Sequence, residues 1–241
     1  MNSCALVTGL AGVSVLLALL VGPSHAYDYQ PLQLGSQWFY DNPVYGPHTM
    51  SITGEREVLG TMTIIRHQEE EGQIYENYWT SDEAGNLFLH GAYNYEGVGA
   101  AYLPPIQVVA APLYLGGAWV TEDIHVYDLD GTPWGNEPFD YRLRVYTEGI
   151  EQVPAGDFYA YGVGTEGGPP AVLARDGQTY DLLGRALSDD YVPAEDSPTD
   201  WYSDGIGEVM WGTTYLFVLV SYDLPVPVVP TTWGRIRSLF R

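Results

Sequence analysis

The sequence contains no lysine, and its single cysteine, Cys4, lies before a hydrophobic segment near the N-terminus. All nine basic residues are arginine, and with 31 acidic residues they give a net charge of −22. A field of this sign repels nucleic acid and anionic membrane surfaces, and it excludes nucleic acid as a partner. If residues 1–26 are removed, no cysteine remains, which excludes disulfides and thiolate chemistry from the mature chain.

The N-terminus has the pattern of a secretory signal. Residues 5–21 are apolar or small and carry no charge, but they are fewer than the roughly 20 residues that a membrane-spanning helix needs. Pro23 follows, and Ser24 and Ala26 supply the small-x-small pattern of a cleavage site. We predict a signal peptide over residues 1–26 and a periplasmic, cell-surface or extracellular location, with no transmembrane span in the mature chain. Because no basic residue precedes the apolar run, a retained N-terminal anchor is the alternative.

The body of the chain predicts a mostly β fold. Its 28 Gly and 17 Pro interrupt every candidate helix, and the segments between them favour strands. In residues 139–145, apolar and charged side chains alternate, as in a half-buried antiparallel strand. Asp130-Gly131 and Asp176-Gly177 predict tight turns. Further strands are predicted at residues 37–40, 49–58, 61–67, 73–80, 87–90, 119–127, 158–163, 208–211 and 215–222, with one short helical turn at 180–187.

A weak internal duplication organises this body. Residues 31–38 and 112–119 both read P-L-x-L-G-x-x-W. In each half a Val and a Gly follow at a turn (58–60 and 153–156), and then an aromatic pair stands before Ser-Asp and Gly (78–85 and 201–207). Three signals in the same order indicate two copies of one β unit, the second enlarged between residues 165 and 199. In the repeated segment Pro fixes the approach to a strand, Gly permits a bend and Trp anchors the core.

We therefore predict a signal peptide (1–26), one β domain (27–223) with halves at about 27–103 and 104–223, a Pro-rich linker (224–230) and a basic C-terminal tail (231–241). The expected architecture is a curved antiparallel sheet or half-barrel with little helix. The tail holds three of the nine arginines and is similar to short tails of unrelated secreted bacterial proteins. It is interpreted either as a sorting or anchoring signal or as a segment that folds back onto the acidic body.

Four ordered segments resemble those of secreted bacterial proteins and lipoproteins described as TapB-like or LolA-like. They are P-L-x-L-G-x-x-W-x-Y (31–40), P-P-I before the second P-L-x-L-G-x-x-W (104–119), E-x-V-x-x-G-x-F (151–158) and W-Y-x-x-G-x-G (201–207). The resemblance spans roughly residues 29–222. It implies a strongly curved antiparallel sheet whose concave face holds an apolar group or a partner, and it implies no catalytic residues.

The sequence shows no recognisable catalytic, cofactor or metal motif. Residues 162–167 fit G-x-G-x-x-G, but Gly168-Pro169-Pro170 opposes the helix that a dinucleotide site needs. His125 shares a predicted strand face with Asp123 and Tyr127, an arrangement that strand alternation also produces by default. Residues 128–131 begin like a calcium loop but lack its later ligands, so a hairpin turn explains them better. No H-E-x-x-H or G-x-S-x-G occurs.

These observations favour a non-enzymatic, exported β protein that binds an apolar or lipid ligand, or a protein partner, at the cell envelope. The 20 Tyr, 7 Trp and 6 Phe support a carbohydrate-binding module as the alternative, because exposed rings stack on sugars. A hydrolase whose triad or carboxylate pair comes from distant segments is the second alternative. No catalytic, metal or cofactor-binding residue is predicted, no cofactor is expected, and no ligand-binding residue is assigned.

Overall fold

The computed structural model describes residues 27–70, 72–135, 137–166, 173–175, 178–180, 198–212 and 216–225. These residues form strands and turns, and none of them belongs to a helix able to cross a membrane. The strands are β1 (Gln37–Asp41), β2 (His48–Val58), β3 (Thr61–Glu70), β4 (Gln73–Ser81), β5 (Leu87–Tyr93), β6 (Gly99–Val109), β7 (Ala118–Tyr127), β8 (Phe139–Val153), β9 (Gly156–Thr165), β10 (Leu173–Arg175), β11 (Gln178–Tyr180), β12 (Asp200–Ser203), β13 (Gly207–Trp211) and β14 (Phe217–Asp223).

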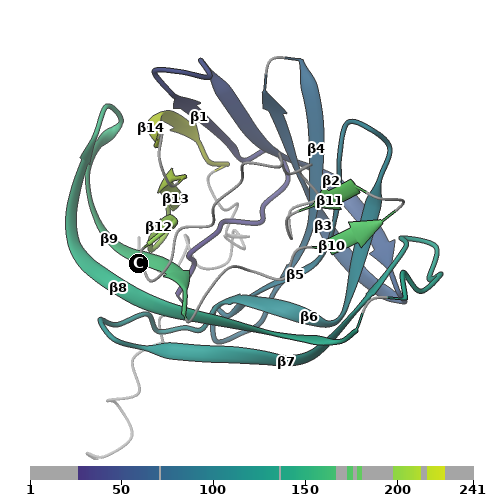
Figure 1. Cartoon of the computed structure of the whole chain (residues 1–241). Coiled ribbons are helices and arrows are strands. Elements are labelled where there is room, and N and C mark those ends of the chain that lie inside the picture. Colours follow the sequence, from purple (N-terminus) through teal and green to yellow (C-terminus); the bar gives the residue numbers. More distant parts are fainter. Residues whose placement is uncertain are drawn as a thin grey trace, which may run out of the picture.

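Twelve of these strands close into one antiparallel barrel (Figure 1). Around the ring the order is β1-β14-β13-β12-β9-β8-β7-β6-β5-β4-β3-β2, and β2 pairs with β1 again. The predicted mostly β class and curved antiparallel sheet are confirmed. The curvature continues to closure, because β1 and β14 pair along their length (Gln37↔Asp223 to Asp41↔Val218).

The ring consists of two six-stranded meanders in the same order. One is β1 to β6, and the other is β7, β8, β9, β12, β13 and β14, so β1 and β7 lie on opposite sides of the ring. The strands β10 and β11 form a separate two-stranded sheet within the enlarged part of the second half. In Figure 1 the long β8–β9 hairpin bends toward β14, where Ala155 N donates to Leu219 O at 3.1 Å.

The two P-L-x-L-G segments make the same turn. In the first half, Gly35 N donates to Ile52 O at 3.0 Å, and Ile52 N donates to the carbonyl of the residue after Gly35 at 2.9 Å. In the second half, Gly116 N donates to Val145 O at 3.0 Å, and Val145 N donates to the carbonyl of the residue after Gly116 at 2.8 Å. Both glycines have positive φ, +90° and +79°. The repeat in the sequence therefore has a counterpart in the backbone hydrogen bonds.

The tryptophans that end the two segments both donate to a main-chain carbonyl, but in different parts of the ring. Trp38 is fully buried, and its indole Nε1 donates at 2.7 Å to Ile206 O in the turn between β12 and β13. Trp119 is partly buried, and its Nε1 donates at 2.8 Å to Gln107 O on the adjacent strand β6. Each ring packs in one of the two large apolar clusters of the barrel.

Every predicted strand overlaps a strand of the structure, but four strands were not predicted: β6, β10, β11 and β12. The strand β6 contains Pro104 and Pro105, which argue against an interior strand in sequence-based reasoning. It also runs across the boundary placed between residues 103 and 104. Of the predicted helical turn at 180–187, residue 180 ends β11 and the rest lies outside the described residues, as do residues 1–26 and 226–241.

Candidate functional site

The segment 27–32, here named the N-terminal strap, packs against two turns of the barrel. One turn joins β4 to β5 and contains Gly85; the other joins β12 to β13 and contains Asp204 and Gly205. Asp28 N donates to Asp204 Oδ1 at 2.7 Å, and Gly205 N donates to Asp28 O at 2.8 Å. A side chain on Gly85 would overlap the carbonyl of Tyr27, so only glycine allows the strap to lie this close.

Tyr29 fixes the strap to the barrel interior. Its ring is 1 % exposed and belongs to an apolar cluster that includes Leu87 and Leu113. Its hydroxyl accepts a hydrogen bond from Leu113 N at 3.2 Å. Burial raises the pKa of Tyr29 to about 12, so the phenol is neutral at physiological pH. The strap is therefore a packed element with one aromatic anchor.

A cavity of about 430 Å³ lies between the strap and the β4–β5 turn. This volume is within the range of about 300–1,000 Å³ that is typical of small-molecule sites. Its lining combines aromatic, aliphatic and hydrogen-bonding groups, and it belongs to Tyr27, Asp28, Tyr29, Gln30, Leu32, Ser81, Asp82, Gly85 and Leu87.

A row of four tyrosines runs from this cavity along the barrel. The ring of Tyr27 stacks on that of Tyr29, with centroids 5.7 Å apart and an interplanar angle of 3°. Tyr29 meets Tyr161 edge-on at 6.1 Å, and Tyr161 meets Tyr159 edge-on at 5.5 Å. The two ends are accessible, because Tyr27 is 38 % and Tyr159 is 52 % exposed. The row thus leads from the cavity, through the buried ring of Tyr29, to the exposed ring of Tyr159 on β9.

The two carboxylates that line the cavity differ in their electrostatics. Burial, and then the charge of Asp204, raises the pKa of Asp28. Desolvation alone would raise the pKa of Asp82. Hydrogen bonds from Asn86, Ala84 and Gly85 outweigh this effect and lower the pKa below its ordinary value. Asp82 is consequently an ionised residue held in its turn. A hydrogen-bond donor or a cation beside Asp28 would stabilise the ionised form of that residue.

Gln30 lines the cavity, but its amide oxygen is not offered to a ligand there. Its side chain is 3 % exposed, and no donor of the described residues lies within hydrogen-bonding distance of its Oε1. This oxygen is closed off from solvent and lies beside Gly207. A buried carbonyl oxygen without a partner costs on the order of 1–3 kcal/mol, and a ligand in the cavity does not recover that free energy.

The interior of the barrel also holds an ion pair that is closed off from solvent. Arg66 Nη1 lies 3.2 Å from Glu208 Oε2, and both side chains are 4 % exposed. The guanidinium stacks over Trp79, with Cζ 4.7 Å from the ring centroid, and also donates to Asn77 Oδ1 at 3.3 Å. Because these partners surround Arg66, the pair is part of the core rather than of the cavity.

The motifs considered in the sequence do not form a site. Residues 162–165 end β9 as an extended strand, and residues 128–131 form a turn in which Gly131 N donates to Asp128 O at 2.9 Å. His125 Nε2 lies 3.7 Å from Asp123 Oδ1, but both side chains are well exposed. Within the part of the chain that the structure describes, no three His, Cys, Asp or Glu side chains are placed to hold a metal ion.

Sequence reasoning missed the strap as a candidate site. Residues 27–32 read Y-D-Y-Q-P-L, with no strand or helix period and no known motif. One signal was present: the alternation of Tyr27 and Tyr29 with polar residues next to the first P-L-x-L-G segment. The partners on the other side, Gly85 and Asp204, are far away in the sequence, and no local pattern connects them to the strap.

The geometry defines a closed antiparallel β-barrel protein with a small cavity under an N-terminal strap. No family model matches the chain, and no curated protein matches it in sequence.

Two solved structures show a distant likeness to the chain. One is a predicted exported protein of Bacteroides fragilis described as having a YmcC-like fold, with 12 % identity, a TM-score of 0.39, and coverage of 82 % of this chain and 100 % of that one. The other is a predicted lipoprotein of Parabacteroides distasonis, with 11 % identity, a TM-score of 0.34, and coverage of 82 % and 99 %. At such TM-scores the likeness carries no conclusion about function. Neither protein is described as TapB-like or LolA-like, so that resemblance stays a prediction.

Proposed function

We propose that the chain is an exported, non-enzymatic binding protein that holds a neutral carbohydrate in the cavity under its N-terminal strap. The observation that carries the proposal is the accessible ring of Tyr27, braced from behind by Tyr29, beside the carboxylates of Asp28 and Asp82. Export follows from the predicted signal peptide over residues 1–26.

The chemistry of the cavity suits a sugar in two ways. A pyranose ring has an apolar face of C–H groups that packs on an aromatic ring, and Tyr27 offers such a ring without losing much side-chain entropy on binding. Its hydroxyls are donors that need acceptors, and the carboxylates of Asp28 and Asp82 are acceptors. An aliphatic ligand would displace water from these carboxylates without offering a donor, at a cost in free energy.

A lipid ligand has less support than a sugar. An acyl chain needs a long cavity with aliphatic walls, whereas the barrel interior holds fully buried large side chains and the Arg66–Glu208 pair. Among the described residues, the largest fully buried side chains are Trp38, Trp79, Tyr29, Tyr78, Tyr102, Met50, Leu87, Leu89, Ile106, Ile124 and Leu219. Interiors at this packing density have no room for a chain without rearrangement.

A protein partner is the second candidate, and one feature of the surface favours it. Ile150 and Tyr159 are direct partners across β8 and β9 and are 67 % and 52 % exposed. Tyr114 and Leu115 are also exposed, and Leu115 N donates to Glu148 Oε2 at 3.1 Å, on the same strand β8 as Ile150. Exposed aromatic and aliphatic groups of this kind are typical of recognition surfaces.

The test is to measure binding of neutral oligosaccharides by calorimetry, first with the unsubstituted chain and then with three variants. Tyr27→Ala removes the ring and is expected to weaken binding by roughly fivefold, corresponding to an aromatic contact of about 1 kcal/mol. Tyr27→Phe keeps the ring and is expected to bind nearly as well. Tyr114→Ala removes another exposed tyrosine, one that does not line the cavity, and serves as the matched control.

Equal affinities for the unsubstituted chain and Tyr27→Ala would contradict the proposal. Loss of binding to a protein partner in Tyr159→Ala, with no sugar binding by any form, would support the second candidate. Release of new reducing ends from the oligosaccharide would show a hydrolase, in which case Asp28 and Asp204 become the first residues to substitute.

A further inference from the structure

The buried ion pair in the barrel interior joins the two related halves. Arg66 comes from β3 in the first half and Glu208 from β13 in the second. Its Nη1 and Oε2 atoms are 3.2 Å apart, with both side chains 4 % exposed. A buried pair of this kind loses the hydration of both charges, and apolar residues of similar size are often as stabilising or more so.

The register of the strands identifies the residue that corresponds to Arg66. In the first half, Ile52 on β2 pairs with Arg66 on β3 directly before a bulge. In the second half, Val145 on β8 pairs with Val163 on β9, again directly before a bulge. Ile52 and Val145 also make the matching hydrogen bonds to the two P-L-x-L-G turns. Val163 is therefore the counterpart of Arg66.

The counterpart of Glu208 follows in the same way. On the first half's β4 and β5, Trp79 pairs with Leu89 directly after a bulge. On the second half's β12 and β13, Tyr202 pairs with Glu208 directly after a bulge. The symmetry of the ring thus maps the Arg66–Glu208 pair onto Val163 and Leu89, which lie in one apolar cluster and are 1 % and 2 % exposed.

One position in the barrel is therefore filled by a charged pair, and the symmetry-related position is filled by apolar residues. The barrel geometry does not require the charges, since Val163 and Leu89 serve at the equivalent position. The charges do make the two halves distinguishable. If two first halves paired, each Arg66 would face a Leu89, and if two second halves paired, each Glu208 would face a Val163.

We propose that the Arg66–Glu208 pair makes the first half of the barrel pair with a second half. It opposes pairing of like halves from two copies of the chain. Pairing of like halves would bury two guanidinium groups or two carboxylates without counter-ions, which is strongly unfavourable. Related halves with equivalent edges are otherwise suited to exchange between chains.

The test is refolding of the chain from urea at several protein concentrations, followed by size-exclusion chromatography with light scattering. In R66V/E208L the charged pair is replaced by Val and Leu, the residues found at the equivalent position. Pairing of like halves then buries no unpaired charge, so like and unlike halves can pair equally well. R66M/E208L does the same with a side chain closer to arginine in length. We expect the unsubstituted chain to give monomer, and both variants to give a dimer fraction that rises with concentration and exceeds the unsubstituted chain's several-fold.

The matched control exchanges the apolar counterparts as V163L/L89V, which leaves the charged pair in place and is expected to refold to monomer. Refolding of both charge-free variants to the same monomer fraction as the control would overturn the proposal. Failure of both variants to fold would also overturn it, because the pair would then be needed for folding itself rather than for the choice between halves.

Discussion

Gly85 determines how closely the N-terminal strap lies to the β4–β5 turn. Its φ is +90°, and a Cβ atom would overlap the carbonyl of Tyr27. Gly85→Ala is expected to cost more than the about 1–2 kcal/mol of a left-handed alanine, because the strap must also move. Urea unfolding measures this loss.

Gly60→Ala is the control for that substitution. Gly60 also has positive φ, +83°, but nothing lies within 4 Å of the position of its Cβ. Only the conformational cost of about 1–2 kcal/mol is expected there. If both substitutions destabilised the chain equally, the strap would not be held by Gly85.

Asp28 links the stability of the strap to pH. Burial, followed by repulsion from Asp204, raises its pKa in the folded state, so the protonated form is favoured there. The stability that this shift provides is present below the unfolded pKa of about 3.9 and is lost as pH rises through the folded pKa. At pH 7 the ionised Asp28 is thus mildly destabilising, and the effect is small because the residue is partly exposed.

Asp28→Asn is accordingly expected to raise the urea midpoint at pH 7 and to leave it nearly unchanged at about pH 3, below the ordinary pKa of aspartate. The amide oxygen of Asn can still accept a hydrogen bond from the strap backbone. A variant less stable than the unsubstituted chain at pH 7 would show that the carboxylate of Asp28 stabilises the fold as an ion.

Individual residues were predictable where a motif placed them. Trp38 and Trp119 were expected as core anchors because each ends a P-L-x-L-G-x-x-W segment, and both indoles donate to main-chain carbonyls. Asp28 and Gln30 were not predictable as site residues. The partner of Asp28 is Asp204, 176 residues away, and contacts over such distances depend on the closed barrel.

At the scale of the element, the repeated turn provides a prediction with an internal comparison. Gly35 and Gly116 hold equivalent positions with φ of +90° and +79°. Gly35→Ala and Gly116→Ala should each cost about 1–2 kcal/mol, since alanine disfavours this conformation and neither site has a close clash. The double variant should lose the sum, because the turns lie on opposite sides of the ring.

These losses can be measured as changes in the free energy of unfolding. If the two single substitutions cost similar amounts, and the double variant loses their sum, the two segments are independent copies of one turn. A neutral substitution at one site and a severe one at the other would show that the halves have diverged in how they use the segment.

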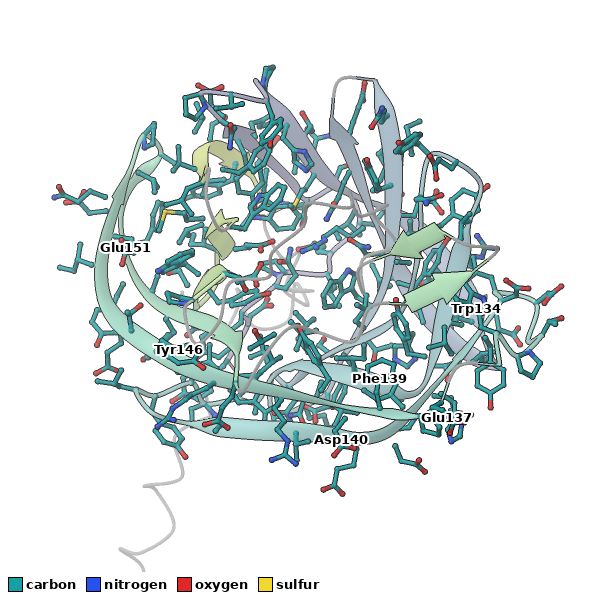
Figure 2. All side chains as sticks on the ribbon, viewed as in Figure 1. Trp134, Glu137, Phe139, Asp140, Tyr146 and Glu151 are labelled. Atoms are coloured by element: carbon teal, nitrogen blue, oxygen red, sulfur yellow. The ribbon has the colours of Figure 1, made fainter. Side chains whose placement is uncertain are left out.

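Strands with a clear alternation or dense β-branched residues were predicted well, and β8 is the best case. Its predicted part, residues 139–145, alternates, and the strand continues to Val153 (Figure 2, where Phe139, Asp140, Tyr146 and Glu151 of this strand are labelled). The strand β6 was missed because Pro104 and Pro105 lie within it, where the pairing with β5 is irregular. The four residues of β12 are too few to show a period.

For the whole molecule, the net charge of −22 predicts which sugars are excluded. Acidic polysaccharides should bind more weakly than neutral ones, and their binding should improve with salt, because screening shortens the range of repulsion from about 30 Å at 0.01 M to about 8 Å at 0.15 M. Neutral oligosaccharides should bind with nearly the same affinity at both salt concentrations. Tighter binding of an acidic polysaccharide at low salt would contradict this.

Closure of the barrel was beyond what local patterns can predict. The sequence favoured a curved sheet, but a curved sheet becomes a barrel only when its edges meet, and here β1 pairs with β14. The duplication was the best long-range signal, since two similar six-stranded units fill one ring. It did not predict the strap that covers the cavity, because the strap has no counterpart that repeats its sequence.

The central claim is that a neutral sugar binds under the N-terminal strap, and methyl NMR during titration with oligosaccharide tests it most directly. Leu32 and Leu87 line the cavity, whereas Leu115 and Ile150 are exposed elsewhere. The account predicts shifts of the Leu32 and Leu87 methyl signals that saturate with ligand and disappear in Tyr27→Ala. Unchanged signals from Leu32 and Leu87, with saturating shifts at Leu115 or Ile150, would contradict it.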